Sequence, residues 1–400
     1  MQTNLTIREA IEAIKAILPH PKTETVPLLE ASGRVLATDL SSLVDHPNTD
    51  DSALDGFAVR LEETRSATRD NPIALRVVGE VAAGASAYSS LLEAGQAVKV
   101  FTGGAVPRGA TGIVAVEHTA RDGDFVLLHQ AAVPEIRLAG QDLQTNTVYL
   151  PKGTRLTGSS IALAAAMGHA LLPVFERPKI AILSTGDEII EPGQALPSGA
   201  VYNANSYGLY AKLLELGAAP TLLPKVPDDL DSLRQAILSA RGSDLLLTIG
   251  GVSMGERDFV RLLLEQEGTP IFWRINVKPG GPPMLGHLQG IPVFGLPGNP
   301  VSSLVVFHVV VQVALLEHWG VTTPAFETVQ ARASTAFASA GAKQGLWRAN
   351  LTWQADHYSV SAFANQSSQV LRSLVQSNAL AVVPPHETRQ IGDWLEVIRL

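Results

Sequence analysis

The stretch LLLTIGGVSMGERD, residues 245–258, decides the fold. Its apolar run ends at Gly250-Gly251, and a polar turn with Ser253 leads into a helical pattern. A buried strand that ends in a glycine turn before a helix presents backbone N–H groups, and open α/β sheets bind anionic ligands there. The sequence KIAILSTGDE, residues 179–188, has the same form and adds carboxylates. Together the two stretches predict one site for a phosphorylated ligand and a metal ion.

The chain around this stretch alternates between strand and helix patterns. Strands are expected at 179–183, 221–225, 245–249, 271–277 and 291–294, with helices near 207–216, 230–240, 258–266 and 301–316. This alternation predicts an α/β domain over residues 178–322, with a central parallel sheet and helices on both faces.

The remaining segments predict three further units. Thr6-Ile7-Arg8-Glu9 is a capping box, and apolar residues then recur at helical spacing to Leu18. We assign this helix to a discontinuous N-terminal helical linker domain of residues 1–44 and 135–177. Short β patterns predict a mostly β insertion at 45–134 and a C-terminal β domain, a small barrel or sandwich, at 323–400.

Composition and charge exclude several classes of protein. A formal net charge of -8 argues against a general nucleic-acid binder. The absence of cysteine excludes disulfides, thiolate zinc sites and a cysteine nucleophile, and it fits a cytoplasmic protein. We expect no signal peptide and no membrane span, because the longest apolar stretch, 301–316, is shorter than the ~20 residues that a span needs.

Four of the expected strands end in turns whose residues could bind a ligand or take part in catalysis. These turns are Thr185-Gly186-Asp187-Glu188, Gly250-Gly251, Lys278-Pro279-Gly280 and Leu296-Pro297-Gly298-Asn299-Pro300. If the four strands run parallel, their ends meet at one edge of the sheet. Acids, a lysine and anion-binding loops would then share one site.

Ser253 allows two interpretations. The segment 251–255 fits the G-x-S-x-G pattern of a serine hydrolase, whose histidine could be His287, His308 or His318. The alternative is that the glycines only permit a tight turn and that Ser253 is solvated.

Six motifs in order resemble those of the molybdopterin molybdenumtransferases, the bacterial MoeA proteins and the matching domain of gephyrin. They are SALDGFAV at 52–59, FTG at 101–103, STGDE at 184–188, GGVSMG with Asp258, KPG at 278–280 and GLPGNPVS at 295–302. The resemblance implies an elongated homodimer of four-part protomers. It also implies that molybdate and adenylylated molybdopterin react, with Mg²⁺, to give molybdenum cofactor and AMP. The adenylyltransferase that precedes this step and the recipient molybdoenzymes are the implied partners.

The resemblance also implies roles for individual residues. The catalytic positions fall on Asp55, Asp142, Glu188, Asp228, Asp258 and Lys278. Substrate-binding positions fall on Thr102, Ser184, Gly250, Gly251, Ser253, Arg274, Pro297, Pro300 and Ser302. Glu188 and Asp258 are expected to hold Mg²⁺, which prefers oxygen ligands.

Three positions depart from the family pattern. Gly281 stands where the family usually has Lys or Arg, Arg274 where it often has Lys, and 366–369 reads QSSQ in place of a glycine-containing pattern. A lost cation at Gly281 should weaken anion binding by about 1.5–3 kcal/mol unless Arg274 covers the loss.

Two other functions remain open at this stage. A non-catalytic binding or scaffold protein could keep the same fold, and an adenylyltransferase could share the central domain alone. The flanking domains argue against the adenylyltransferase, and molybdate-dependent AMP release would separate an enzyme from a scaffold.

Overall fold

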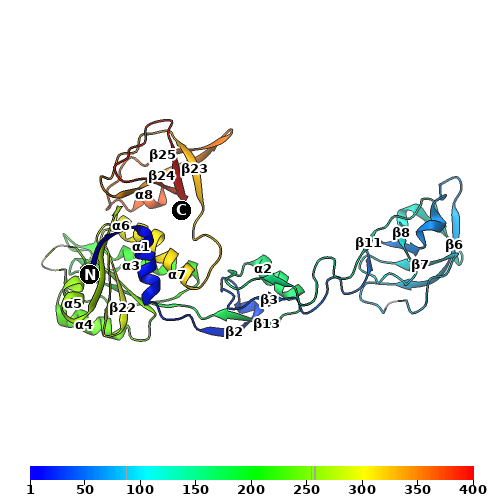
Figure 1. Cartoon of the computed structure of the whole chain (residues 1–400), viewed down its shortest axis with the longest axis horizontal. Coiled ribbons are helices and arrows are strands. Elements are labelled where there is room, and N and C mark those ends of the chain that lie inside the picture. Colours follow the sequence, from blue (N-terminus) through cyan, green and yellow to red (C-terminus); the bar gives the residue numbers. More distant parts are fainter. Residues whose placement is uncertain (87, 254, 256–257) are drawn as a thin grey trace.

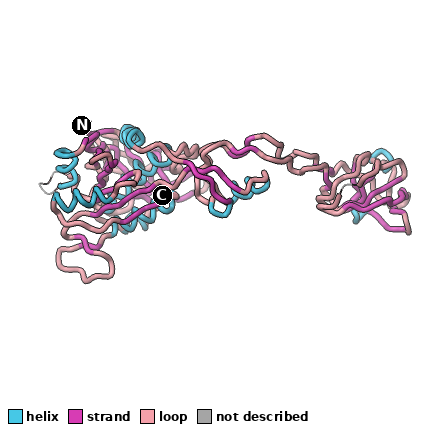
Figure 2. Tube along the Cα trace, turned by 90° about the horizontal axis from the view of Figure 1, so that it is seen from below, coloured by secondary structure: helices cyan, strands magenta, loops and turns pink. Residues whose placement is uncertain are grey.

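The protein is elongated, with a large body at one end, a narrow middle and a small β domain at the other end (Figure 1). Our description rests on a computed structural model that covers residues 1–400 except Ala87, Met254, Glu256 and Arg257. A second view confirms that only thin connections join the small domain to the rest (Figure 2). The large body itself contains the α/β domain and, packed beside it, the C-terminal domain.

A seven-stranded sheet forms the centre of the α/β domain. Its order is β1 (Gln2–Leu5), β19 (Thr269–Ile275), β21 (Met284–Leu288), β22 (Ile291–Leu296), β18 (Leu245–Ile249), β14 (Lys179–Ser184) and β17 (Ala219–Leu222). The ladders β14–β17, β14–β18, β18–β22 and β1–β19 are parallel, whereas β21 runs antiparallel to both neighbours. The strands with the four expected turns therefore share one direction.

Helices cover both faces of this sheet. One core contains the buried side chains of α1 (Ile7–Ile17), α3 (Ala204–Leu216) and α6 (Pro300–Val306). The opposite core contains those of α4 (Leu230–Ser239) and α5 (Phe259–Glu267). Buried β14 and β18 carry apolar side chains toward both cores, as two-sided parallel sheets require.

The apolar helix after β22 continues through the π-helical turn η4 (Phe307–Val311) into α7 (Gln312–His318). The stretch Pro300–His318 is long and apolar enough to cross a membrane, with a mean hydropathy of 1.8. However, 78% of it is buried inside the protein. It is the core helix that the sequence predicts.

The N-terminal segment lies elsewhere than expected. Instead of joining the linker, β1 adds a parallel edge strand to β19, and α1 packs on the central sheet through Ala10, Ile11 and Ile14. The physical reason is that the apolar face of α1 is covered by α/β core residues. The capping box itself is present, since the Thr6 side chain accepts from the Glu9 backbone and Glu9 bonds back to Thr6.

The middle of the molecule combines one helix with short strand pairs. The helix is α2 (Gly158–Ala166), and a 3₁₀ turn, η1, spans Leu28–Glu30. The pairs are β2 (Thr23–Pro27) with β13 (Leu171–Phe175) and β3 (Leu40–Ser41) with β12 (Val148–Leu150). They share a small core around Leu36, Met167 and Leu172.

The distal domain is built on a six-stranded sheet. Its order is β8 (Gly112–Ala115), β5 (Gly56–Val59), β7 (Gln96–Val100), β6 (Ile73–Val81), β10 (Phe125–Leu128) and β9 (Thr119–Asp122). The short pair β4 (Asp51–Ser52) and β11 (Ile136–Arg137) stands where the chain enters and leaves, and 3₁₀ turns occupy Leu61–Thr64 and Val116–His118. This mostly β architecture agrees with the fold expected from the sequence.

The C-terminal domain is a closed barrel. Its strands are β23 (Thr328–Ala333), β24 (Gln344–Gln354), β25 (His357–Ala362), β26 (Ala379–Val383) and β27 (Trp394–Arg399), with α8 (Arg372–Val375) between β25 and β26. Closure follows because β24 pairs with both β25 and β26, while β23 and β27 complete the circuit. A two-residue strand of the α/β domain, β20 (Val277–Lys278), extends this sheet by pairing with β24.

The expected fold class is confirmed, with local differences. Strands β21 and β27 were not predicted, and β19 and β20 were expected as one strand. A positive φ of 74° at Arg274 stands near the end of β19, shortly before the break between the two strands. A small ribbon, β15 (Ile189–Ile190) with β16 (Val201–Tyr202), stands beside the end of β14.

Candidate functional site

A cavity of about 750 Å³ opens at the carboxyl ends of β14, β18 and β22. We call it the strand-end cavity. It brings together nine of the predicted site residues: Ser184, Glu188, Asp228, Gly250, Gly251, Ser253, Asp258, Pro297 and Pro300. Thr185, Asn205 and Gln369 also line it. The parallel direction of the strands explains why positions so far apart in sequence meet here.

The two glycines after β18 are required by the turn itself. Gly250 and Gly251 have φ values of 90° and 68°, which side-chain-bearing residues rarely adopt. A Cβ at Gly251 would lie 3.0 Å from Val260 Cγ2. The Gly250 N–H donates to Leu296 O at 2.9 Å, so this turn is tied to the end of β22. Met254, Glu256 and Arg257 of the same motif lie outside the described residues.

Three predicted carboxylates line the strand-end cavity from different loops. Glu188 folds over Gly186, where an added Cβ would lie 2.7 Å from its Oε2. Asp258 accepts from the Gly255 N–H at 2.5 Å through Oδ2. The backbone N–H of Asp228 donates to Asp187 Oδ1 at 3.3 Å. Among the described residues, no group of three or more His, Asp or Glu side chains is arranged to hold a metal ion.

The histidines do not support a serine hydrolase. Ser253 is exposed, and in the described part of the chain no histidine bonds to it. His308 pairs with Gln312 at 3.2 Å, and the His318 ring bonds Pro19 O at 2.8 Å. The structure therefore favours the second interpretation, a glycine turn that ends in a solvated serine.

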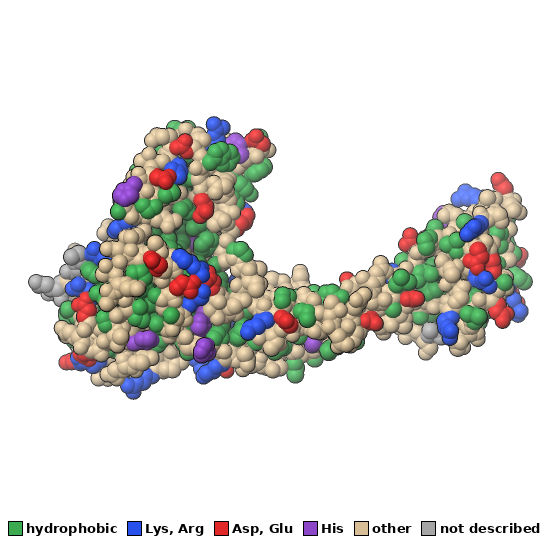
Figure 3. All heavy atoms as spheres, viewed as in Figure 1, with side chains coloured by type: hydrophobic (Ala, Val, Ile, Leu, Met, Phe, Trp, Pro, Cys, Tyr) green, Lys and Arg blue, Asp and Glu red, His purple; other side chains and the backbone are tan. Residues whose placement is uncertain are grey.

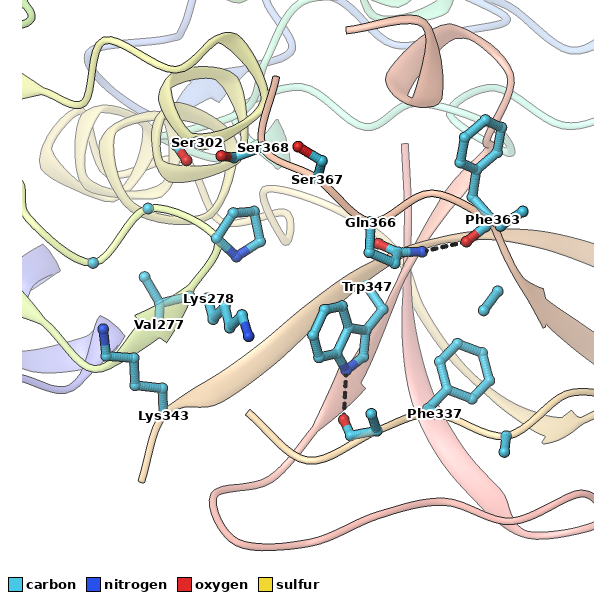
Figure 4. Close-up of a pocket in the computed structure, with 17 residues that line it drawn as sticks. Val277, Lys278, Ser302, Phe337, Lys343, Trp347, Phe363, Gln366, Ser367 and Ser368 are labelled. Atoms are coloured by element: carbon cyan, nitrogen blue, oxygen red, sulfur yellow. Dashed lines mark hydrogen bonds between the residues drawn. The ribbon is translucent and has the colours of Figure 1, made fainter. Parts of the chain in front are cut away.

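A second cavity, of about 840 Å³, lies between the α/β domain and the C-terminal barrel. We call it the interdomain cavity. Lys278, Gly281 and Ser302 line it from the α/β side, while Lys343, Trp347 and residues 366–368 line it from the barrel. Figure 4 shows Lys278 extending toward the Trp347 ring, and its Nζ lies 5.6 Å from the ring centroid. Trp347 is held in turn by a bond of 3.1 Å from Nε1 to Ala338 O.

The two cavities are neighbours with common walls. Residues 278–281 line the interdomain cavity and Pro282 the strand-end cavity. At the start of α6, Pro300 lines the strand-end cavity and Ser302 lines the interdomain cavity. Gln369 likewise lines the strand-end cavity, and Ser368 the interdomain cavity. A bond of 3.1 Å from Val301 N to Ser368 O joins two of these walls. A ligand in one cavity is therefore separated from a ligand in the other only by short loops.

A buried arginine supports the barrel wall of the interdomain cavity. Arg348 Nη2 donates to Ser367 O at 3.0 Å and Nε to Ser373 Oγ at 3.1 Å. Gln366 bonds to both the N–H and the carbonyl of Arg348. Burial lowers the pKa of the Arg348 guanidinium to about 10, so it stays charged at neutral pH. This cation fixes the loop at 366–368 from behind.

Four predicted site residues lie outside both cavities. Asp55 and Thr102 stand together in the distal domain, where Asp55 Oδ1 accepts from the Thr102 N–H at 2.7 Å and from its hydroxyl at 2.8 Å. These two bonds, the backbone one first, hold the pKa of Asp55 below its ordinary value. Asp142 is exposed near the distal end of the linker, and its N–H donates to His46 O at 3.0 Å. Figure 1 shows how far the distal domain lies from the large body.

Arg274 is the fourth residue outside the cavities. Its guanidinium stacks on the Trp273 ring at 4.3 Å from the centroid, and its Nε is buried without a partner among the described residues. Arg274 is therefore not placed to replace the cation missing at Gly281.

Lys343 and Trp347 were not predicted from the sequence, because no site motif marks this part of the barrel. Lys343 directly precedes β24, and Trp347 lies on it. The sequence offered one signal for a further cation, the glycine at position 281 where the family pattern has Lys or Arg. The visible face in Figure 3 mixes acidic and basic side chains and shows no single broad basic patch.

Comparison with known proteins covers nearly the whole chain. Residues 5–168 match the family described as "MoeA N-terminal region (domain I and II)", residues 181–318 "Probable molybdopterin binding domain" and residues 330–400 "MoeA C-terminal region (domain IV)". A molybdopterin molybdenumtransferase of Nostoc sp. is 33% identical over 96% of this chain and 91% of its own length. Molybdopterin molybdenumtransferase 2 of Mycobacterium tuberculosis is 36% identical over 95% of each chain. The crystal structure of a molybdopterin biosynthesis MoeA protein from Pyrococcus horikoshii OT3 covers 99% of this chain and 100% of that chain, with 29% identity and a TM-score of 0.84.

Proposed function

We propose a mechanism for this chain on the premise that it belongs to the molybdopterin molybdenumtransferase (MoeA) family and acts in molybdenum cofactor biosynthesis. In our proposal it transfers molybdenum from molybdate to adenylylated molybdopterin and releases AMP. The observation that carries this proposal is the pair of adjoining cavities. One is lined by anion-binding turns and carboxylates. The other is lined by two lysines and, among the residues that the structure describes, by no carboxylate.

The strand-end cavity is suited to the pyrophosphate of the adenylylated pterin. Its turns after β14, β18 and β22 combine glycines, a serine and a helix N-terminus, which together favour phosphate groups. Thr185 and Asn205 extend the polar lining, and Asn205 Nδ2 braces Gly298 O at 2.7 Å. The α6 N-terminus begins at Pro300, whose missing N–H costs nothing at a first helical position.

Glu188 and Asp258 fit a magnesium ion that binds together with substrate. Mg²⁺ usually takes one or two protein carboxylates plus phosphate oxygens and waters, so a larger acidic cluster is not needed. The Glu188 carboxylate occupies space left open by Gly186. The Asp258 carboxylate accepts the Gly255 N–H through Oδ2, which leaves Oδ1 for the metal ion. When bound, the ion would offset the charge that develops as the phosphoanhydride breaks.

The interdomain cavity is suited to molybdate. Molybdate is a tetrahedral dianion, and the ammonium group of Lys278 offers three donors. The Ser302 hydroxyl and the Ser367–Ser368 segment add neutral polar groups. Because the cavities adjoin, molybdate held here would stand beside the pterin end of a ligand in the strand-end cavity.

A second copy of the chain would complete the site. Asp55 and Thr102 match site motifs yet lie at the far end of their own molecule. A homodimer that sets the distal domain of one chain beside the α/β domain of its partner would bring these motifs together. We place this dimer in the cytoplasm, with the adenylyltransferase and the recipient molybdoenzymes as its partners.

The proposal predicts that Glu188→Gln and Asp258→Asn each remove most molybdenum insertion while the fold persists. Each change deletes a negative charge at the proposed metal position without changing side-chain size. Asp231→Asn, on α4 and paired with Arg234 outside both cavities, is the matched control. AMP release and pterin-nucleotide binding should be measured with varied Mg²⁺. Near-normal turnover of both site variants would contradict the metal role.

A further inference from the structure

The barrel places an ammonium group where the α/β domain lacks a side chain. A Cβ built at Gly281 would lie 2.9 Å from Lys343 Nζ, with Val277 O next at 3.4 Å. Position 281 is the one at which the family pattern calls for Lys or Arg. In this chain the space in which such a side chain would begin is occupied by the end of Lys343.

Backbone pairing between the domains fixes this placement. Strand β20 runs parallel to the start of β24, with Val277 opposite Gln344 and Lys278 opposite Gly345. The Gln344 N–H also donates to Asn276 O at 3.0 Å. Lys343 directly precedes Gln344, so the ladder sets its backbone beside the turn that carries Gly281. The meeting of Lys343 and Gly281 is therefore a consequence of how the barrel docks.

Neither lysine of the interdomain cavity is neutralised by a carboxylate. Among the described residues, Lys278 and Lys343 make no ion pair and no hydrogen bond, and no acid lines the cavity. Figure 4 shows the Lys343 side chain rising from the barrel toward the strand with Val277 and Lys278. The two lysines line one cavity from opposite domains, with the ammonium group of Lys278 toward Trp347 and that of Lys343 toward Gly281. This excess of positive charge along the cavity favours a doubly charged anion.

We propose that Lys343 supplies the second cation of the interdomain cavity, in place of a side chain at position 281. This inference rests on the proposed function of that cavity as the molybdate site. It implies that the site is complete only when the barrel is docked on the α/β domain. It also replaces the expectation that the loss at Gly281 weakens anion binding, because a cation from the C-terminal barrel takes that place.

The test is direct binding of molybdate to the full-length protein by isothermal titration calorimetry, without pterin substrate. Lys343→Gln should weaken binding about 10-fold, the effect of one partly solvated charged contact. Arg399→Gln removes a charge from the same barrel outside both cavities and should bind like the wild type. Circular dichroism and thermal melting confirm that each variant is folded.

Combining Gly281→Lys with Lys343→Gln tests whether a cation from either position can serve the same site. Gly281→Lys should restore binding in the Lys343→Gln background to within about 3-fold of the wild type. The same change in the wild type should have little effect, because both ammonium groups then compete for one space. Wild-type affinity in Lys343→Gln would overturn the inference, as would an equal gain from Gly281→Lys in both backgrounds.

Lys278→Gln separates this inference from the proposed function. If Lys278→Gln weakens molybdate binding and Lys343→Gln does not, the cavity holds the anion and only the role of Lys343 is wrong. If neither variant changes the binding measured for the wild type, or the wild type binds no molybdate, the interdomain cavity is not the molybdate site and both proposals fail.

Discussion

Gly280→Ala should be strongly destabilising, because the turn that separates the two cavities is packed directly on α6. Gly280 has a φ of 105°, and a Cβ there would overlap Val306 Cγ2 and lie 3.1 Å from Ser302 O. Val306 is fully buried in the α/β core and cannot move outward. The change therefore adds backbone strain and overpacking at one position.

The expected loss is the sum of these two effects. A side chain at a strongly positive φ costs about 1–3 kcal/mol. Forcing a methyl group into a packed core costs about 1–3 kcal/mol more. We therefore expect the free energy of unfolding to fall by roughly 2–6 kcal/mol. Because the turn also carries Lys278, molybdate affinity should fall while binding of the pterin nucleotide is less affected.

Gly290→Ala is the matched control. Gly290 has a φ of 82° in the turn between β21 and β22, but a Cβ there meets nothing within 4 Å. Denaturant unfolding of both variants, followed by tryptophan fluorescence, isolates the overpacking from the backbone strain. If Gly280→Ala loses no more stability than Gly290→Ala, the close packing of the turn on α6 is refuted.

Two further predictions concern the dimer and pH. Mixing Asp55→Asn chains with Glu188→Gln chains should restore one intact site per heterodimer, and heterodimers without AMP release would contradict the shared site. Burial lowers the pKa of His308, which stacks on Phe326 and whose Nε2 lacks a partner among the described residues. The unfolded state then binds more protons below pH ~6.5, so stability should fall as pH drops from 7 to 5, by at most about 1.4 kcal/mol per pH unit. The slope should be shallower in His308→Gln and unchanged in the exposed control His20→Gln. An equal slope in His308→Gln would refute this assignment.

The sequence predicts the strand-end cavity well because its parts are local. Gly250-Gly251, Glu188 and Pro297 each follow an apolar strand directly, and parallel strands bring such ends together without further information. The glycine turn expected after β18 is also present, since Gly250 and Gly251 both have a positive φ. Glu188, Gly250, Gly251, Pro297 and Pro300 were accessible for this reason, whereas Asp228 was expected only from the family resemblance.

The interdomain cavity could not be predicted in the same way. Its second lysine meets Gly281 only through the β20–β24 ladder, which joins residues more than 60 positions apart and has no sequence signal. The placement of β1 and α1 has a similar cause, because a four-residue edge strand has too few positions to show a pattern. Long-range pairing, rather than local preference, decides both features.

The most direct test of the proposed activity measures the release of AMP from adenylylated molybdopterin by the purified wild-type protein. We expect release to require both Mg²⁺ and molybdate, with one AMP formed for each molybdenum inserted. Substituting Lys278→Gln should raise the molybdate concentration needed, and Glu188→Gln should abolish most release at any molybdate concentration. AMP release that is independent of molybdate, or its absence from a folded wild-type protein that still binds the pterin nucleotide, would contradict the account.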